Sequence, residues 1–426
     1  MKTLDRRALV VPVLFLLYVG AITSVSTFLS IFLVRDQGMA AALVGLGVLA
    51  QSLARAVLAP FVGALSDRYG RRGLLIGSAA LSAVVTPGFL LVNDFGTLMA
   101  WSIALGLVQG PFFPVGISLL LDLTPAPRRQ TMVALNTTAL NVGYTLSIAP
   151  AGYLVDAGFG WLAVWSVAQF VLVSVVLVAF VRGALPRDAT ERNPRLLALT
   201  LHAFRDRTFI LLSLVSFTLP LSLGLLVTVL PLHAAEIGMP GRTIGLLLSL
   251  NGVVVAVLML PFNLLLERFG PFVPLPFAAL IVALSELILR DGSLVSFATA
   301  VVLFGVGEVI FSATLVSGIA ALTPPGARGA YQGAWALVSS IGFGSALLLA
   351  GLVRSAVGWS TMWTIFAAVT AVSAVALAAW ARPMTRVASG RAGVVVEGGT
   401  RPSSTALSGL VEAEVEEGER RTAPRR

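Results

Sequence analysis

Long apolar runs separated by short polar segments dominate the pattern along this chain. Most runs have about the 20 residues that an α-helix needs to cross the hydrocarbon core of a bilayer. They do not alternate polar and apolar residues, as the strands of a membrane β-barrel do. The pattern predicts an all-α integral membrane protein with twelve transmembrane helices, at residues 9–34, 40–65, 73–92, 97–121, 131–155, 161–181, 209–233, 243–266, 272–289, 294–321, 331–353 and 360–381.

The polar segments divide these spans into two groups of six. Residues 182–208 hold six arginines and interrupt the apolar pattern, so they are predicted to form a cytoplasmic linker. This linker separates an N-terminal six-helix half, residues 1–181, from a C-terminal six-helix half, residues 209–384. Residues 385–426 are polar and end in mixed Glu and Arg, a composition typical of disorder, and they are predicted to form a disordered cytoplasmic tail.

Short segments recur in the two halves at nearly constant spacing, which indicates an internal duplication. Each pair lies in the equivalent loop of its half. The pairs are 63–72 with 263–271, 123–125 with 322–324, and 160–161 with 358–359. The two halves are therefore predicted to be parallel pseudo-repeats, and membrane proteins built in this way usually move solutes.

Charge follows the same topology. Of the 29 Lys and Arg residues, 24 fall at the two ends of the chain and in loops of one side, four fall in loops of the other side, and Arg55 lies inside a span. Basic residues concentrate on the cytoplasmic side of membrane proteins. Both termini are therefore predicted to be cytoplasmic, in a multi-pass protein of the cell (inner) membrane. The net charge of +9 reflects this topology and the lipid bilayer as a partner, so no nucleic-acid partner is expected.

The segment from Gly63 to Arg72 closely resembles the signature that the major facilitator superfamily carries between its second and third helices. The segment from Glu267 to Gly270 resembles the degenerate copy usual in the second half of that family. This resemblance covers about residues 8–382. It implies a twelve-helix fold with a central cavity lined chiefly by helices 1, 4, 7 and 10. It also implies alternating access, in which the two halves rock about the substrate.

Within that superfamily, the chain looks most like the drug and small-molecule efflux carriers. Ala149-Pro150-Ala151-Gly152 resembles the Gly-Pro-x-x-Gly core of the motif typical of antiporters. Gln109-Gly110 resembles the end of the Arg-x-x-Gln-Gly motif that is linked to proton coupling. Gly106 stands where that motif has its arginine, so the family's coupling mechanism does not transfer directly.

The polar turn between spans two and three is the first candidate site. A carboxylate among guanidiniums makes charge-assisted pairs with neighbouring helix ends, and Asp122 at the end of span four is a suitable partner. We interpret the turn as a conformational latch that holds the halves together on the cytoplasmic side; the alternative is a turn that only caps helices and fixes topology. The latch candidates are Gly63, Asp67, Arg68, Gly70, Arg71, Arg72, Asp122, Glu267 and Arg268.

Two charges lie deep in predicted spans. Glu308 is near the middle of span ten, where ionisable residues are expensive and face a cavity or a partner. Burial favours the neutral form of a carboxyl group, so Glu308 is predicted to bind and release the coupling proton. Arg55 lies at similar depth in span two, where it either binds an anionic substrate, neutralises Glu308 or serves packing. Glu286 and Arg290 are expected to form an interfacial pair, and His233 to be an incidental residue near the outer surface.

Polar and aromatic residues inside the spans supply candidates for a substrate cavity. Small polar residues also hold membrane helices together, and Phe residues also face lipid, so both interpretations stay open. The candidates are Thr23, Thr27, Gln109, Phe112, Phe113, Asn136, Asn141 and Asn251.

No catalytic signature accompanies these groups. The chain has no cysteine and no P-loop, HExxH, GxSxG or dinucleotide fingerprint, so we expect no enzyme, no cofactor and no metal site. We predict a monomeric secondary active transporter that exports small organic or amphipathic compounds in exchange for protons. The alternatives are a carrier that takes up a polar metabolite such as a sugar and, remotely, a membrane receptor or enzyme without transport activity.

Overall fold

The computed structural model describes residues 6–181, 203–324 and 327–397, and these are helical with short connections. The predicted all-α membrane fold is therefore confirmed. Most of the predicted linker and the last part of the predicted tail lie outside the described residues. The helix that precedes the tail continues to Glu397, which is beyond the predicted boundary at residue 384.

The N-terminal half contains six helical segments. They are α1 (Val10–Ser30) with η2 (Ile31–Asp36), α2 (Ala41–Tyr69), α3 (Arg71–Val85) with η3 (Thr86–Leu91), α4 (Phe95–Gln109) with α5 (Phe112–Leu123), α6 (Arg129–Ala157) and α7 (Phe159–Phe180). The fourth segment is divided at Gly110 and Pro111, because proline removes a backbone donor and disturbs the preceding turn.

The C-terminal half repeats this order. Its segments are α9 (Arg207–Ser216), α10 (Thr218–Gly224), η5 (Leu225–Val229) and α11 (Leu230–Glu236), then α12 (Gly241–Leu266), α13 (Leu275–Ile288) with η7 (Leu289–Asp291), α14 (Leu294–Leu322) and α15 (Arg328–Glu397). Within α15, Gly358 has φ 75° and ψ 175°, a backbone conformation that glycine adopts readily and that breaks the helix into two spans.

The described helices account for the twelve predicted spans. Nine segments are long and apolar enough to cross a membrane, and the last of them contains the break at Gly358 and so holds two spans. The other two spans are α6, which carries several Asn and Thr residues, and α13, which has 14 residues in its α-helical part. Both pack against neighbouring spans.

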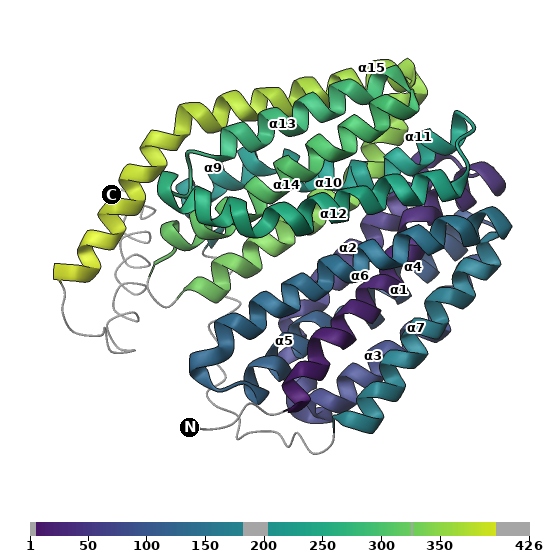
Figure 1. Cartoon of the computed structure of the whole chain (residues 1–426), viewed down its shortest axis with the longest axis horizontal. Helices are drawn as coiled ribbons and strands as arrows, with labels where there is room; N and C mark the ends of the chain where they lie inside the picture. The colour runs from purple at the N-terminus through teal and green to yellow at the C-terminus, as the bar shows by residue number, and fades with distance from the viewer. Residues whose placement is uncertain (1–5, 182–202, 325–326, 398–426) are drawn as a thin grey trace, which may run out of the picture.

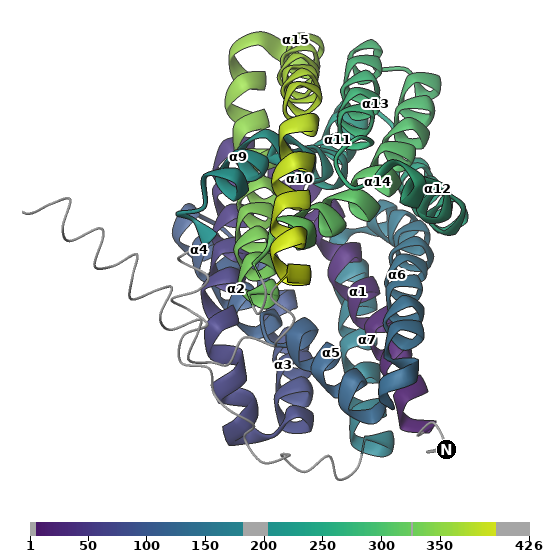
Figure 2. The same ribbon diagram turned by 90° about the vertical axis from the view of Figure 1, so that its left-hand side faces the viewer.

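The two halves form separate bundles that lie side by side, as Figures 1 and 2 show. They meet mainly along two helix pairs, α2 with α15 and α6 with α12. Gly152 on α6 is close to the backbone of Gly241 and Gly245 on α12, where a β-carbon would collide with main-chain atoms. We call the end of the bundle where these residues lie the Asp156 end, and the opposite end, at the α2–α3 turn, the Gly70 end.

The described hydrogen bonds between the halves lie toward the Asp156 end and the middle. Ser30 donates to the carbonyl of Thr228 at 2.8 Å, and Ser249 donates to the carbonyl of Thr145 at 3.1 Å. The carboxylate of Asp156 accepts from the first backbone N–H groups of α12. The halves are therefore bound together at the Asp156 end in this conformation.

Candidate functional site: a central cavity between the halves

A cavity of about 500 Å³ lies between the two halves. Its wall draws on α1, α2, α5 and α6 of the N-terminal half, and on α10, η5, α12, α14 and α15 of the C-terminal half. The family resemblance implied walls from the first, fourth, seventh and tenth spans, and each contributes. The second, fifth, eighth and eleventh spans contribute as well.

Arg55 provides the positive charge of the N-terminal wall. Its Nη2 donates to Oε1 of Gln109 at 2.8 Å, and Nε2 of Gln51 donates to the same oxygen at 3.3 Å. Gln109 is almost fully buried behind these two residues. The Nε of Arg55 is also buried, and it has no hydrogen-bond partner within the part of the chain that the structure describes.

The structure gives a reason for the glycine at position 106. A β-carbon on Gly106 would collide with the backbone carbonyl of Gln51 and approach the side chain of Ala54, because α4 packs closely on α2 at this point. An arginine side chain has no room to leave α4 there. The guanidinium that contacts Gln109 comes from Arg55 on α2 instead.

Glu308 provides the negative charge of the C-terminal wall. Its Oε2 accepts a hydrogen bond from Nδ2 of Asn251 on α12 at 3.0 Å. Tyr144, on α6 of the other half, lines the same cavity, and its hydroxyl is buried without a hydrogen-bond partner among the described residues. Groups from both halves thus surround this carboxylate.

Arg55 and Glu308 both line the cavity, but they do not pair with each other. Ion pairs within the described part of the chain join Arg35 with Asp36, Arg71 with Asp122, and Arg354 with Glu236, and none is formed between Arg55 and Glu308. In this conformation Arg55 therefore does not neutralise Glu308 by direct contact, which was one of the roles considered for it. Each charge is held by amide side chains of its own half, which fix its position without cancelling it.

Four of the predicted cavity residues line the wall, and four do not. Thr23, Phe113, Asn141 and Asn251 are in the wall. Gln109 lies one layer behind it.

Thr27, Phe112 and Asn136 are buried inside the N-terminal half, which corrects their assignment. The cavity-facing side of α1 runs through Thr23 and Ser26, and Thr27 lies beside it. Phe112 stacks on Tyr18 with ring centroids 3.4 Å apart, so its side chain is directed into the core.

Several wall residues were not predicted from the sequence. They are Gln51 on α2, Tyr144 on α6, and Ser339, Ser340 and Phe343 on α15. The signal available was a polar or aromatic residue in the middle of an apolar run. That signal marks many packing positions too, because it does not report which side of the helix faces the cavity.

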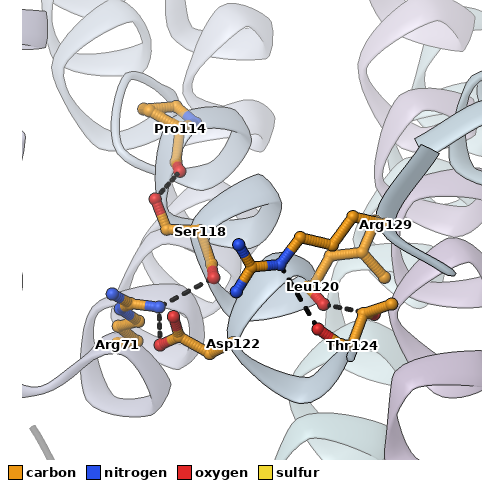
Figure 3. A network of polar contacts seen from close by, with 7 residues as sticks. All are labelled: Arg71, Pro114, Ser118, Leu120, Asp122, Thr124 and Arg129. Atoms are coloured by element: carbon orange, nitrogen blue, oxygen red, sulfur yellow. Dashed lines mark hydrogen bonds and ion pairs between the residues drawn. The ribbon is translucent and has the colours of Figure 1, made fainter. Parts of the chain in front are cut away.

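The Gly70 turn tethers the helices of the N-terminal half to each other. Arg71, the first residue of α3, forms an ion pair with Asp122 and donates to the carbonyl of Ser118 at 2.7 Å, both on α5 (Figure 3). Arg72 donates to the carbonyl of Val178 on α7 at 2.8 Å. Figure 3 also shows Arg129 at the start of α6, which donates to the carbonyl of Thr124 at 3.4 Å.

The other latch candidates add little to this picture. The side chains of Asp67, Arg68 and Glu267 lie outside the part of the chain that the structure describes, as does position 63. Arg268 is exposed. The contacts described for this turn stay within one half, so the latch between the halves remains a prediction.

Two residues outside the cavity are more buried than the sequence suggested. Glu286 is only 2% exposed and accepts a hydrogen bond from Ser222 on α10 at 2.5 Å, whereas Arg290 is exposed, so the expected pair between them does not form. His233 is 3% exposed, and its Nδ1 accepts from the indole N–H of Trp363 at 3.0 Å. It is therefore a packed residue and not an exposed one. Among the described residues, no group of His, Asp and Glu is arranged to hold a metal ion.

Comparisons with known proteins agree with this architecture. The family model described as Major Facilitator Superfamily matches residues 12–289 and 212–411. The chain is similar to the uncharacterized MFS-type transporter YqjV of Bacillus subtilis (strain 168), with 26% identity over 337 residues, which are 76% of this chain and 82% of the relative. It is also similar to the quinolone resistance protein NorA of Staphylococcus aureus (strain MSSA476), with 24% identity over 216 residues, 50% of this chain and about half, 53%, of NorA.

Solved structures share the fold at low sequence identity. The nucleoside transporter NupG matches with a TM-score of 0.70 and 15% identity over 88% of this chain and 99% of its own. A POT family transporter in complex with 5-aminolevulinic acid matches with a TM-score of 0.73 and 13% identity over 89% of this chain and 97% of its own. At this identity the likeness concerns the fold alone.

Proposed function

We propose that this membrane transporter, which belongs to the Major Facilitator Superfamily, exports small organic or amphipathic molecules in exchange for protons. The observation that carries the proposal is the position of Glu308. It is a carboxylate in the wall of a cavity between the halves, without a cationic partner among the described residues. Ionisable residues inside membrane spans are costly and mark substrate, ion and proton pathways.

Exchange follows from competition at this carboxylate. A proton on Glu308 removes its charge, while the deprotonated form attracts cationic or hydrogen-bond-donating groups of a substrate. Glu308 on α14 and Tyr144 on α6 line the same cavity, so the carboxylate faces a space that both halves enclose. Proton binding is therefore expected to alter both substrate affinity and the preferred arrangement of the halves.

The direction of transport depends on orientation. The concentration of basic residues at the Gly70 end supports placing that end in the cytoplasm. The Asp156 end, where the halves are hydrogen-bonded together, then faces the outside. In the proposed cycle, the cavity loads from the cytoplasm, the contacts at the Asp156 end open, and the Gly70 turn secures the cytoplasmic side as a latch.

The relatives support efflux more than uptake. NorA is named for quinolone resistance, and it aligns with half of this chain. Uptake of a polar metabolite is the second candidate, which the amide groups of Gln51, Asn141 and Asn251 in the wall favour. The similarity to nucleoside and POT family transporters extends to the fold only.

Transport in vesicles tests the proposal. The purified protein is reconstituted, a pH gradient is imposed in either direction, and accumulation of a panel of organic cations, weak bases, quinolones and sugars is measured. The wild type should move at least one organic compound against the proton flux. Glu308→Gln should lose most gradient-driven transport yet retain binding or exchange of the same compound.

Asp291→Asn is the matched control, since this carboxylate is exposed in the 3₁₀ turn η7 and does not line the cavity. It should transport as the wild type does. Full gradient-driven transport by Glu308→Gln would contradict the role of this residue. Movement of a sugar with the proton gradient by the wild type would favour the uptake alternative.

A further inference from the structure

The cavity carries one charge of each sign, and the two charges belong to different halves. Arg55 on α2 and Glu308 on α14 both line it. Neither takes part in an ion pair within the described part of the chain. The halves move relative to each other in a transporter of this fold. The distance between the two charges therefore changes during the transport cycle.

Amide groups hold each charge without neutralising it. Gln109 accepts a hydrogen bond from Arg55, and Asn251 donates one to Glu308. Within the described residues, the Arg55 guanidinium and the Glu308 carboxylate thus each line the cavity without an ion-pair partner. A ligand group of opposite charge that reaches either residue can make a charge-assisted hydrogen bond with it.

The space between the charges suits an organic scaffold. A volume of about 500 Å³ lies within the range typical of small-molecule sites, roughly 300–1,000 Å³. Apolar side chains make up much of the cavity wall, among them Ile22, Phe113 and Phe343. A ligand with one charged group satisfies one wall and leaves the opposite charge uncompensated, whereas a ligand with both satisfies both.

We propose that the preferred substrates are amphoteric molecules, with an anionic group that binds Arg55 and an ammonium group that binds Glu308. This inference rests on the proposed function, because it assigns the substrate class of the same cavity. Such a substrate contacts both halves at once. Its anionic group can accept two hydrogen bonds from the guanidinium of Arg55. Its ammonium group can donate hydrogen bonds to the carboxylate of Glu308.

A set of three matched compounds tests the proposal. Norfloxacin carries one carboxylate and one secondary amine; its methyl ester lacks the anion, and its N-acetyl derivative lacks the cation. Binding of each radiolabelled compound to the purified full-length protein is measured at fixed pH. Each masked compound should bind roughly 10- to 100-fold more weakly than norfloxacin, since a hydrogen-bonded charge pair is lost.

Substitutions then assign each group of the ligand to its residue. In Arg55→Gln, norfloxacin and its methyl ester should bind equally, while the penalty for N-acetylation persists. In Glu308→Gln, the penalty for N-acetylation should vanish, while that for esterification persists. Non-additivity of this kind identifies direct partners. Arg55→Lys keeps the charge and should keep part of the penalty for esterification.

Arg290→Gln and Asp291→Asn are the controls, because both residues are exposed and neither lines the cavity. Both should reproduce the wild-type ranking of the three compounds. If a substituted protein fails to purify as a single species, the affinities of the wild-type protein for the three compounds decide whether the proposed substrate class holds. Equal binding of the three compounds by the wild type, or penalties that persist in both cavity variants, would overturn the proposal.

The two proposals can fail separately. If the three compounds rank as expected but no pH gradient drives their movement, the substrate class stands and proton coupling is rejected. If the gradient drives transport but the amphoteric compound has no advantage over its masked forms, the proposed function stands and the substrate class is rejected.

Discussion

Asp156, near the end of α6, accepts a hydrogen bond at 2.6 Å from the backbone N–H of Gly241, the first residue of α12. Its second oxygen accepts from the backbone N–H of Arg242 at 3.0 Å. The carboxylate of one half therefore caps a helix of the other half. An acidic group at a helix N-terminus satisfies free N–H groups and interacts favourably with the helix dipole.

We expect Asp156→Ala to weaken closure at this end. Loss of a helix cap costs about 1 kcal/mol, which shifts the equilibrium between closed and open forms roughly fivefold. Asp156→Asn keeps an acceptor and should have a smaller effect. Spin labels on cysteines at Tyr153 and Leu246, exposed on α6 and α12, report the distance between the halves, and the native chain has no cysteine to interfere. Unchanged distance distributions in both variants would rule out the role.

Gly152 lies at the same crossing, and a side chain there should force the helices apart. The position of its absent β-carbon is occupied by the backbone of Gly241 and Gly245. Gly152→Val should therefore shift the spin-label distances toward the open form, and the crowding should also lower stability by about 1–3 kcal/mol. Gly160→Val is the control, because nothing lies near its β-carbon position. Equal behaviour of the two variants would contradict this steric explanation.

The pair of Arg71 and Asp122 should matter for turnover and not for folding. Both side chains are partly exposed, and exposed ion pairs contribute at most about 1 kcal/mol. If the Gly70 turn is a latch, Asp122→Asn should slow transport while the melting temperature stays nearly constant. Asp36→Asn, which removes an exposed pair with Arg35, is the matched control and should leave transport unaffected. Normal turnover by Asp122→Asn would restrict this pair to a structural role.

Asp94 gives a pH-dependent contribution to stability outside the membrane. It precedes α4, and its carboxylate accepts from the backbone N–H of Thr97 at 2.8 Å, which holds the pKa of Asp94 below its usual value. A carboxylate with a lowered pKa stabilises the fold above the unfolded-state value of about 3.9 and loses this effect as the pH falls through the folded-state value.

Asp94→Ala should therefore lower the melting temperature at neutral pH. The difference from the wild type should shrink as the pH falls below about 4. Asp94→Asn keeps a capping side chain that does not titrate, so its melting temperature should follow pH less steeply than that of the wild type in this range. Melting curves of the purified protein between pH 3 and 7 measure both effects. A constant difference across the range would contradict the assignment.

The architecture was predictable from the sequence because lipid imposes a simple rule. A span must satisfy its backbone hydrogen bonds internally and expose apolar side chains, so its length and composition identify it. The twelve spans followed from this rule, and the duplication followed from short segments that recur in the equivalent loops of both halves. The end of the last helix did not, since the helix continues to Glu397 through Gly390 and Gly393, although glycine often ends helices.

The site was only partly predictable. The sequence pattern gives the position of a residue along a membrane span, but not whether its side chain faces the cavity. Glu308 and Arg55 were identified by their depth in apolar runs, and both line the cavity. Phe112 and Phe113 are adjacent, yet only Phe113 reaches the cavity, while Phe112 stacks on Tyr18. Which neighbour faces inward depends on how the helices are rotated against one another, and one sequence does not state that rotation.

Glu286 is a second carboxylate within the described helices, more buried than Glu308, and the two residues have different surroundings. It lies on α13 inside the C-terminal half, accepts from Ser222 at 2.5 Å and does not line the cavity. No charged side chain forms an ion pair with it in the described part of the chain.

We expect Glu286→Gln to change stability by less than about 1 kcal/mol, because an amide of similar shape keeps an oxygen that accepts from Ser222. Glu286→Lys places an unpaired charge in the same space and should lower stability by about 3–5 kcal/mol. Glu286→Gln should also keep gradient-driven transport, whereas Glu308→Gln should lose it. Thermal unfolding and vesicle transport of the three proteins measure these effects together. Loss of proton-driven transport in Glu286→Gln, with stability intact, would move coupling from the cavity into the core of the C-terminal half.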